Sequence, residues 1–308
     1  MLEPRTLYDV DESAVAALLG ERKPGDVGPV LLYAIAGFMD AGSAGAVAVE
    51  HLRTTFTPTR LVTFDVDLLL DYRSKRAAMT FATDRWTDYD QPFFAIDHLR
   101  DAEGTGFLLL HGAEPDLHWE RVIEALLGLI DRFAVSLTVG FHGMPMGIPH
   151  TRPLSLTAHA TRTELLGDHT AWFGTVRVPA SLGALLEFRL GAAGHDAVGY
   201  TVHVPHYLSQ ATYPPAAVAA LNAVERLTGL DLAVCGLSKA AREATEEVSR
   251  QVGESEEVAA VVHALEDQYD AFTRSVGRKS LLAEAGPIPT AEELGAEFER
   301  FLAQQAGE

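Results

Sequence analysis

The chain has 308 residues, of which 47% are hydrophobic and 22% charged, and its formal net charge is −19 at pH 7. This composition is typical of a folded, soluble protein and excludes a largely disordered one. The excess of acids argues against nucleic acid as a partner, because phosphate binding requires clustered lysine and arginine. It also argues against an anionic membrane surface as a partner.

Cysteine usage and the N-terminal residues predict a cytoplasmic protein. Cys235 is the single cysteine, so no intrachain disulfide can form, and its apolar neighbours predict a small side chain in the core. The N-terminal residues lack the basic start and apolar centre of a secretory signal. Residues 133–151 carry no Asp, Glu, Lys or Arg, but their glycines and prolines predict a strand and a loop instead of a membrane-spanning helix.

Strand patterns alternate with helix patterns as far as residue 229, and only helix patterns follow. The first two strands and the helix between them are expected to form a β-α-β unit, and residues 68–92 a long excursion or hairpin. Strands are expected at 30–36, 61–66, 92–96, 107–110, 135–139 and 197–204, and helices at 12–19, 43–53, 118–132, 180–192 and 214–228.

This order predicts a three-layer α/β/α sandwich with a helical C-terminal appendage. We expect a lead-in at 1–27, an α/β domain at 28–235 and the appendage at 236–308. The appendage is expected to begin with two helices that are separated near Gly253, and to end with an acidic helix at 290–304.

Valines on the first two appendage helices form an apolar stripe that requires a surface to pack on. The stripe predicts self-association. Its members include Val248, Val252, Val258, Val261, Val262 and Leu265.

The first candidate site is the glycine-rich loop after the strand at 30–36. Strand C-termini and helix N-termini are common ligand sites in α/β sheets, which makes Gly37, Asp40 and Gly42 binding candidates. The alternative is a tight turn in which the glycines allow close packing. The glycine spacing matches neither the dinucleotide fingerprint nor a phosphate loop, so no cofactor is expected.

A second candidate follows the strand at 107–110. His111 and Glu114 are candidates for binding or acid–base chemistry, but the spacing of nearby acids and histidines matches no standard zinc motif, and we expect no metal. Asp116 is expected to cap the following helix, and Trp119 to anchor its packing.

Two further loops are rich in histidine and proline. In the loop predicted at 140–153, His142, His150 and Arg152 are candidates for contact with a carboxylate or phosphate, or for ordering an interface. His206 and Tyr207 follow the strand at 197–204. Ten of the 12 histidines lie between His98 and His206.

Five short motifs in one order resemble the proteasome assembly chaperone 2 family, and in particular its actinobacterial members. The resemblance covers roughly residues 28–270, most of the chain. The motifs are Gly37-Phe-Met-Asp-Ala-Gly42, His111-Gly-Ala-Glu-Pro115 with Trp119, His150-Thr-Arg-Pro153, Val204-Pro-His-Tyr-Leu208, and Tyr213-Pro-Pro-Ala216 with Gly229-Leu-Asp-Leu232.

The resemblance implies a three-layer fold similar to nucleoside phosphorylases and peptidyl hydrolases. It also implies self-association and makes proteasome subunits candidate partners. Some relatives dock a C-terminal hydrophobic–tyrosine–any-residue tail into the proteasome ring. The chain ends Gln304-Gln-Ala-Gly-Glu308, which departs from that pattern and argues against tail docking. The resemblance carries over no catalytic residue.

Two functional hypotheses follow. The first is an oligomeric binding or scaffold protein, in which the loops order an interface. The second is a small-molecule enzyme or sensor, hydrolase- or phosphorylase-like, with a pocket at the sheet edge. The second requires Asp40, Glu114, His142, His150 and His206 to converge on one concave site.

Overall fold

The computed structural model describes residues 3–20, 25–37, 39–167 and 175–281, with side chains as far as residue 274. Contacts divide the chain into two units, Met1–Glu266 and Asp267–Glu308, and the description below concerns the first. The acidic helix expected at 290–304 lies outside the described residues, and the expected division at 27 and 235 stays a prediction.

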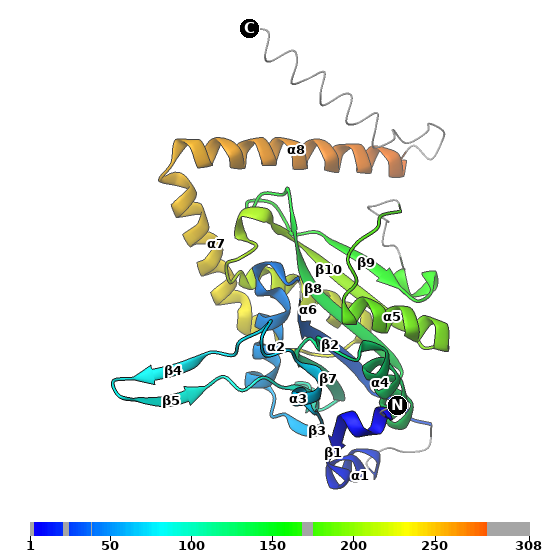
Figure 1. The fold of residues 1–308 in the computed structure, drawn as a ribbon. Coiled ribbons are helices and arrows are strands. Elements are labelled where there is room, and N and C mark those ends of the chain that lie inside the picture. Colours follow the sequence, from blue (N-terminus) through cyan, green and yellow to red (C-terminus); the bar gives the residue numbers. More distant parts are fainter. Residues whose placement is uncertain (1–2, 21–24, 38, 168–174, 282–308) are drawn as a thin grey trace. The chain divides into compact units, whose positions relative to one another are not determined.

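An eight-stranded mixed sheet forms the centre of the first unit (Figure 1). Its order is β1-β3-β6-β7-β2-β8-β10-β9, in which β7, β2, β8 and β10 are neighbouring parallel strands and the other pairings are antiparallel. The strands of this sheet are β1 (Tyr8–Val10), β2 (Val30–Ala36), β3 (Thr59–Phe64), β6 (Phe94–Arg100), β7 (Gly106–Ala113), β8 (Leu137–Met146), β9 (Leu156–Ala160) and β10 (Ala197–Pro205).

Helices cover both faces of this sheet, and a separate hairpin joins β4 (Met79–Ala82) to β5 (Arg85–Tyr89). The α-helices are α1 (Glu12–Gly20), α2 (Ala44–Thr55), α3 (Val66–Leu69), α4 (Trp119–Phe133), α5 (Leu182–Ala193), α6 (Pro214–Thr228), α7 (Ser238–Gly253) and α8 (Glu256–Leu281).

The central strands are apolar on both faces, as a covered sheet requires. In β2, Leu31 and Tyr33 enter the core on the side of α1, α4 and α5, whereas Leu32 and Ala34 enter the core on the side of α2 and α6. The two cores lie on opposite faces because side chains alternate along a strand. The predicted three-layer α/β/α architecture is confirmed.

Some expected elements differ in extent or neighbours. The loop predicted at 140–153 begins later, because β8 continues as far as Met146 beside β10. The β2-α2-β3 unit is formed, but β3 lies beyond β7 and β6 instead of next to β2. The edge strands β1 and β9 are additions to the predicted set.

Cys235 is exposed, so its prediction as a core residue is wrong. It lies in a 3-10 turn, Val234–Leu237, in which Val234 is the buried residue. The expected stripe of valines is covered only in part. Val262 is buried and Val248 packs on the α2–α6 core, whereas Val258 and Val261 are exposed.

Gly143 allows β8 to pass directly beneath the loop that leads into α2. A Cβ at this position would lie 2.0 Å from the carbonyl oxygen of Ala41. Because a backbone atom cannot move aside as a flexible side chain does, Gly143→Ala is expected to lower the free energy of unfolding by about 3 kcal/mol, the upper end for overpacking. Urea denaturation measures this loss.

Gly128, within α4, is the matched control because a Cβ there has no heavy atom within 4 Å. Gly128→Ala is expected to stabilise the protein by about 0.5–1 kcal/mol through its better helix propensity. Equal effects at the two glycines would contradict the steric argument.

Candidate functional site

The candidate loops all follow strands of the parallel group. Since β2, β7, β8 and β10 run the same way, the loops after residues 36, 113, 146 and 205 lie at one edge of the sheet, as expected. Their side chains nevertheless belong to three separate arrangements, described in turn below.

A pocket of about 360 Å³ lies at this edge, over the ends of β2 and β7 and beside α2. Asp40, His111 and His142 are the sequence candidates that line it. Its wall also includes Arg53 and Phe93.

His111 is held in the floor of the pocket by a buried carboxylate. Its Nε2 lies 2.7 Å from Oδ2 of Asp97, and both side chains are 1% exposed. Arg60 binds the other oxygen of Asp97, and Arg53 lies 3.6 Å from Oδ2. Burial alone would raise the pKa of Asp97, but the hydrogen bonds from His111 and Arg60 lower it below its usual value. Asp97 therefore remains a carboxylate at neutral pH.

Asp40 orders the glycine-rich loop. Its carboxylate accepts hydrogen bonds from the backbone N–H groups of Gly45 at 2.9 Å, Ala46 at 3.0 Å and Gly143 at 3.1 Å. It thereby caps α2 and ties it to β8. Gly42 has φ of +66°, and a Cβ there would lie 3.1 Å from Val204, so the tight-turn interpretation describes this loop.

Glu114 caps a different helix. Its Oε1 accepts the N–H of Leu182 at 2.7 Å, at the start of α5. Gly37 lies against the same side chain, because a Cβ there would be 2.2 Å from Oε2 of Glu114. Glu114 and Gly37 do not line the pocket described above.

Asp116 does not cap α4, contrary to expectation. The N-cap residue is His118, which makes no side-chain cap. Asp116 instead accepts the N–H of Asp71 at 2.9 Å and pairs with Lys75 at 3.1 Å, which anchors the base of the β4–β5 hairpin. Trp119, the first residue of α4, packs against the core and donates to the carbonyl of Pro115 at 2.5 Å, so its role as an anchor is confirmed.

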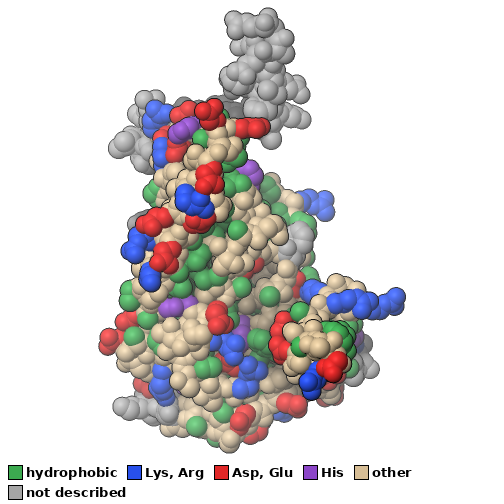
Figure 2. Space-filling model, turned by 90° about the vertical axis from the view of Figure 1, so that its left-hand side faces the viewer, with side chains coloured by type: hydrophobic (Ala, Val, Ile, Leu, Met, Phe, Trp, Pro, Cys, Tyr) green, Lys and Arg blue, Asp and Glu red, His purple; other side chains and the backbone are tan. Residues whose placement is uncertain are grey.

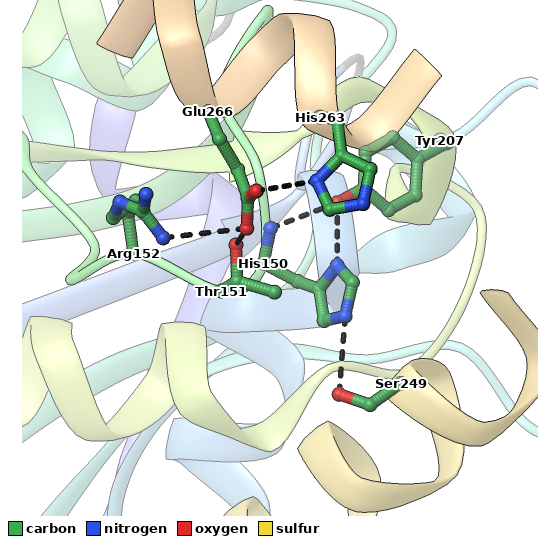
Figure 3. Close-up of polar contacts among 7 residues, drawn as sticks. All are labelled: His150, Thr151, Arg152, Tyr207, Ser249, His263 and Glu266. Carbon is green, nitrogen blue, oxygen red and sulfur yellow. Dashed lines mark hydrogen bonds and ion pairs between the residues drawn. The ribbon is translucent and has the colours of Figure 1, made fainter. Parts of the chain in front are cut away.

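His150 belongs to a third arrangement, which we call the His150 cluster (Figure 3). It consists of His150, Thr151, Arg152, Tyr207, Ser249, His263 and Glu266. These side chains come from the loop after β8, the turn after β10, helix α7 and the part of α8 that ends at Glu266, so the cluster attaches α7 and the start of α8 to the sheet edge.

The protons of His150 can be assigned from its partners. Ser249 donates its hydroxyl proton to the carbonyl of Thr245 at 2.9 Å, so it accepts from Nε2 of His150 at 3.2 Å. Tyr207 accepts the backbone N–H of His150 at 2.8 Å and donates its own proton to Nδ1 at 2.7 Å. His150 is thus neutral, with its proton on Nε2.

This assignment leaves His150 without a free lone pair to act as a general base towards Ser249, so the pair is not a Ser–His nucleophile in this arrangement. Burial lowers the pKa of His150 below its ordinary value and raises the pKa of Tyr207 to about 12. Both shifts favour the neutral network.

Glu266 completes the cluster on the side of α8. It accepts from Thr151, lies 2.9 Å from Nδ1 of His263 and pairs with Arg152 at 3.3 Å. The hydrogen bonds from Thr151 and His263 lower the pKa of Glu266, and its carboxylate therefore stays charged at neutral pH.

The five residues required to converge by the enzyme or sensor hypothesis do not share one site. Asp40 and His142 line the pocket, whereas Glu114 caps α5 and His150 holds α7. His206 is exposed, and its ring packs against Tyr207.

The sequence analysis missed the partners that define these sites. Asp97, Arg53 and Arg60 lie on strands and a helix without any motif, and Ser249 and Glu266 lie on the C-terminal helices, where the sequence analysis named no site residue. One signal was available for Asp97, which is a charged residue within the apolar strand that pairs with the strand of His111.

Within the described residues, no group of three or more His, Cys, Asp or Glu side chains is arranged to hold a metal ion. In the same part of the chain, no helix has both the length and the apolar character needed to cross a membrane.

A family model described as PAC2 family matches residues 34–252. The chain belongs to the PAC2 family. Among curated proteins, none matches it.

Solved structures of three similar proteins agree in fold. The protein of unknown function Rv2714 from Mycobacterium tuberculosis is 45% identical, with a TM-score of 0.83 over 87% of this chain and 92% of its own. A Corynebacterium glutamicum protein of unknown function is 33% identical, with a TM-score of 0.79 over 86% and 97% of the two chains. The M. tuberculosis proteasome-assembly chaperone homologue Rv2125 is 26% identical, with a TM-score of 0.69 over 76% and 99%.

Proposed function

We propose that this PAC2 protein is an oligomeric scaffold of the proteasome-assembly-chaperone type, and that the β4–β5 hairpin is its contact with a second copy. The family and its similarity to a proteasome-assembly chaperone homologue support a chaperone-like role. The observation that carries self-association is the exposure of this hairpin.

The hairpin has no packing partner of its own within the large sheet. Its two strands pair with each other alone, and every residue in them is exposed. In Figure 1 it extends away from the sheet. An isolated two-stranded hairpin is at best marginally stable in water, so this one requires a surface that covers it.

Its side chains suit a protein surface. Phe81 is 56% exposed and Trp86 62% exposed, and their rings contact edge to face at a centroid distance of 5.0 Å. Exposed aromatic pairs of this kind are typical anchors of interfaces.

Charge favours a second copy as the partner. Residues 72–82 carry Arg73, Lys75 and Arg76 and no acid, whereas the whole chain has a net charge of −19. Residues 83–90 of the other arm carry Asp84, Asp88 and Asp90 beside Arg85, so the basic arm of one copy can meet the acidic arm or the acidic surface of a second copy. In Figure 2 acidic and basic side chains are intermingled over the face shown, without the single-sign patch that nucleic acid would require.

Native mass spectrometry tests the proposal with the full chain at micromolar concentration. We expect a discrete homo-oligomer, and a further complex when proteasome α subunits from the same host are added. A monomer would contradict self-association, and a homo-oligomer that forms no complex with α subunits would contradict the proteasome role.

The hairpin itself is tested by Phe81→Ser with Trp86→Ser. The double variant is expected to be a folded monomer, because both anchors are lost. Phe188→Ser is the matched control, since Phe188 is 67% exposed on α5, away from the hairpin, and should leave the oligomer intact. An oligomer that survives the double substitution would show that another surface makes the contact.

A further inference from the structure

The pocket beside α2 lies where an α/β sheet opens to ligands. β2 and β7 are adjacent and parallel, yet the chain leaves β2 towards α2 on one face and leaves β7 towards α4 on the other. Connections that depart to opposite faces leave a crevice at the carboxyl ends of the two strands. Residues 34–36 and 111–113 line the pocket at these ends.

Small residues create the space. A pocket of about 360 Å³ is within the range of small-molecule sites. Larger side chains at the same positions on β2, α2 and β7 would fill it. The small residues in its lining are Ala34, Ala36, Gly45, Ala46, Gly112 and Ala113.

Two arginines lie beside the single carboxylate of Asp97. The two oxygens of Asp97 are already bound by Arg60 and His111. Arg53 lies 3.6 Å from the same carboxylate, and its buried Nε has no hydrogen-bond partner. Two arginines thus share one carboxylate.

The acids in the lining do not neutralise Arg53. Asp40 is occupied by three backbone N–H groups. Glu50 is exposed, and the described residues show no ion pair between it and Arg53.

The remaining wall suits a flat apolar body. Phe93 lies beneath the guanidinium of Arg53 at 5.8 Å, and Ile35, Val49 and Phe141 complete the apolar lining. A guanidinium that is oriented by an aromatic ring presents its N–H groups in a plane, which matches a carboxylate. A dianion such as phosphate would bring two negative charges beside the carboxylates of Asp40 and Glu50 in the lining, whereas a carboxylate brings one.

We propose that this pocket binds a small organic acid, whose carboxylate pairs with Arg53 and whose apolar body packs on Phe93. The site is separate from the hairpin contact and does not depend on it. It adds a ligand to the proposed scaffold without requiring catalysis.

Ligand-observed NMR on the full chain tests the proposal with a panel of acids: benzoate, phenylacetate, 3-phenylpropionate and hexanoate, each beside its neutral amide. We expect at least one acid to bind, and its amide to bind at least about tenfold more weakly, the change that corresponds to the loss of about 1.4 kcal/mol.

Two variants assign the binding to this pocket. Arg53→Met removes the charge and keeps the length, so it should weaken the acid by about tenfold or more and leave the amide unchanged. Ala46→Trp, at an exposed position on α2 that lines the pocket, should abolish both. Arg189→Met on the exposed face of α5 is the control and should bind as the parent chain does.

Three results would each overturn the proposal: no acid of the panel binds, acid and amide bind alike, or Arg53→Met binds the acid as the parent chain does. Circular dichroism of each variant separates a lost site from a lost fold. The oligomer measured by native mass spectrometry is unaffected by these outcomes, so the two proposals fail independently.

Discussion

Asp97→Ala is expected to lower the free energy of unfolding by about 3–5 kcal/mol, the cost of removing one partner from a buried ion pair. Asp97 is 1% exposed, and it is the group to which both His111 and Arg60 are bound. Its removal leaves the buried imidazole of His111 without its acceptor and Arg60 without its counter-ion. The midpoint and slope of urea denaturation give the loss.

Asp196→Ala is the matched control. Asp196 also binds an arginine, through two 2.6 Å hydrogen bonds from Arg162, but the two side chains are 30% and 53% exposed. Exposed pairs contribute at most about 1 kcal/mol, because water solvates each partner when the other is removed. Equal losses at Asp97 and Asp196 would contradict the claim that burial sets the cost.

A double-substitution cycle measures the coupling between His111 and Asp97. If His111 and Asp97 act together, Asp97→Ala should cost less in a His111→Phe background, by about 0.5–3 kcal/mol. Additive losses would show that Asp97 stabilises the protein through its arginine partners, Arg60 and Arg53, and not through His111.

The sequence predicted the elements well where hydrophobic residues follow a regular pattern along the chain. Val30–Ala36 reads as a strand covered on both faces, and the structure places alternate residues in the two cores. Pro214–Thr228 has the predicted bounds because Pro214 begins the helix and Gly229 ends it with φ of +73°.

The strands that were missed form because they pair with a neighbouring strand, and their own residues show no clear strand pattern. β9 is a half-buried edge strand whose register is set by β10, and the end of β8 is a strand because β10 continues beside it. Cys235 was misplaced because the apolar run around it turns through a 3-10 helix, in which Val234 faces the core and Cys235 faces solvent.

Candidate residues were found more easily than their roles. Asp40 and Glu114 stand after strands as ligand-binding acids do, but both cap helices, a use that depends on which N–H groups the fold brings to them. His111 and His150 were found by residue type, whereas their partners Asp97 and Ser249 come from distant elements. The spacing of residues in one chain cannot show such contacts.

The attachment of α7 to the sheet edge is expected to weaken as the pH falls from about 7 to about 5. Burial lowers the pKa of His150 below its unfolded value of about 6.5, so the unfolded state takes up a proton more readily than the folded one. Stability is therefore complete above about pH 6.5 and is lost progressively below it. Protonation also places a proton on Nδ1, where Tyr207 already donates.

The neighbouring groups do not reverse this sign. Tyr207 stays protonated throughout, because its pKa is raised to about 12. Glu266 favours a charged His150, but it is engaged by Thr151, His263 and Arg152, and its lowered pKa keeps it a carboxylate over this range. Arg152 stays charged and opposes a second positive group nearby.

Hydrogen-exchange protection factors of the α7 amides report this attachment locally. They are expected to fall with pH in the parent chain and to change much less in His150→Gln, because the substituted amide does not titrate in this range. His203→Gln is the matched control: burial lowers the pKa of His203 as well, but this side chain binds Ser155 and Thr157 beside β10. Its loss should alter overall stability and leave the pH dependence of α7 in place. Protection of α7 that is independent of pH, or that falls equally in His150→Gln, would mean that the His150 cluster does not sense pH.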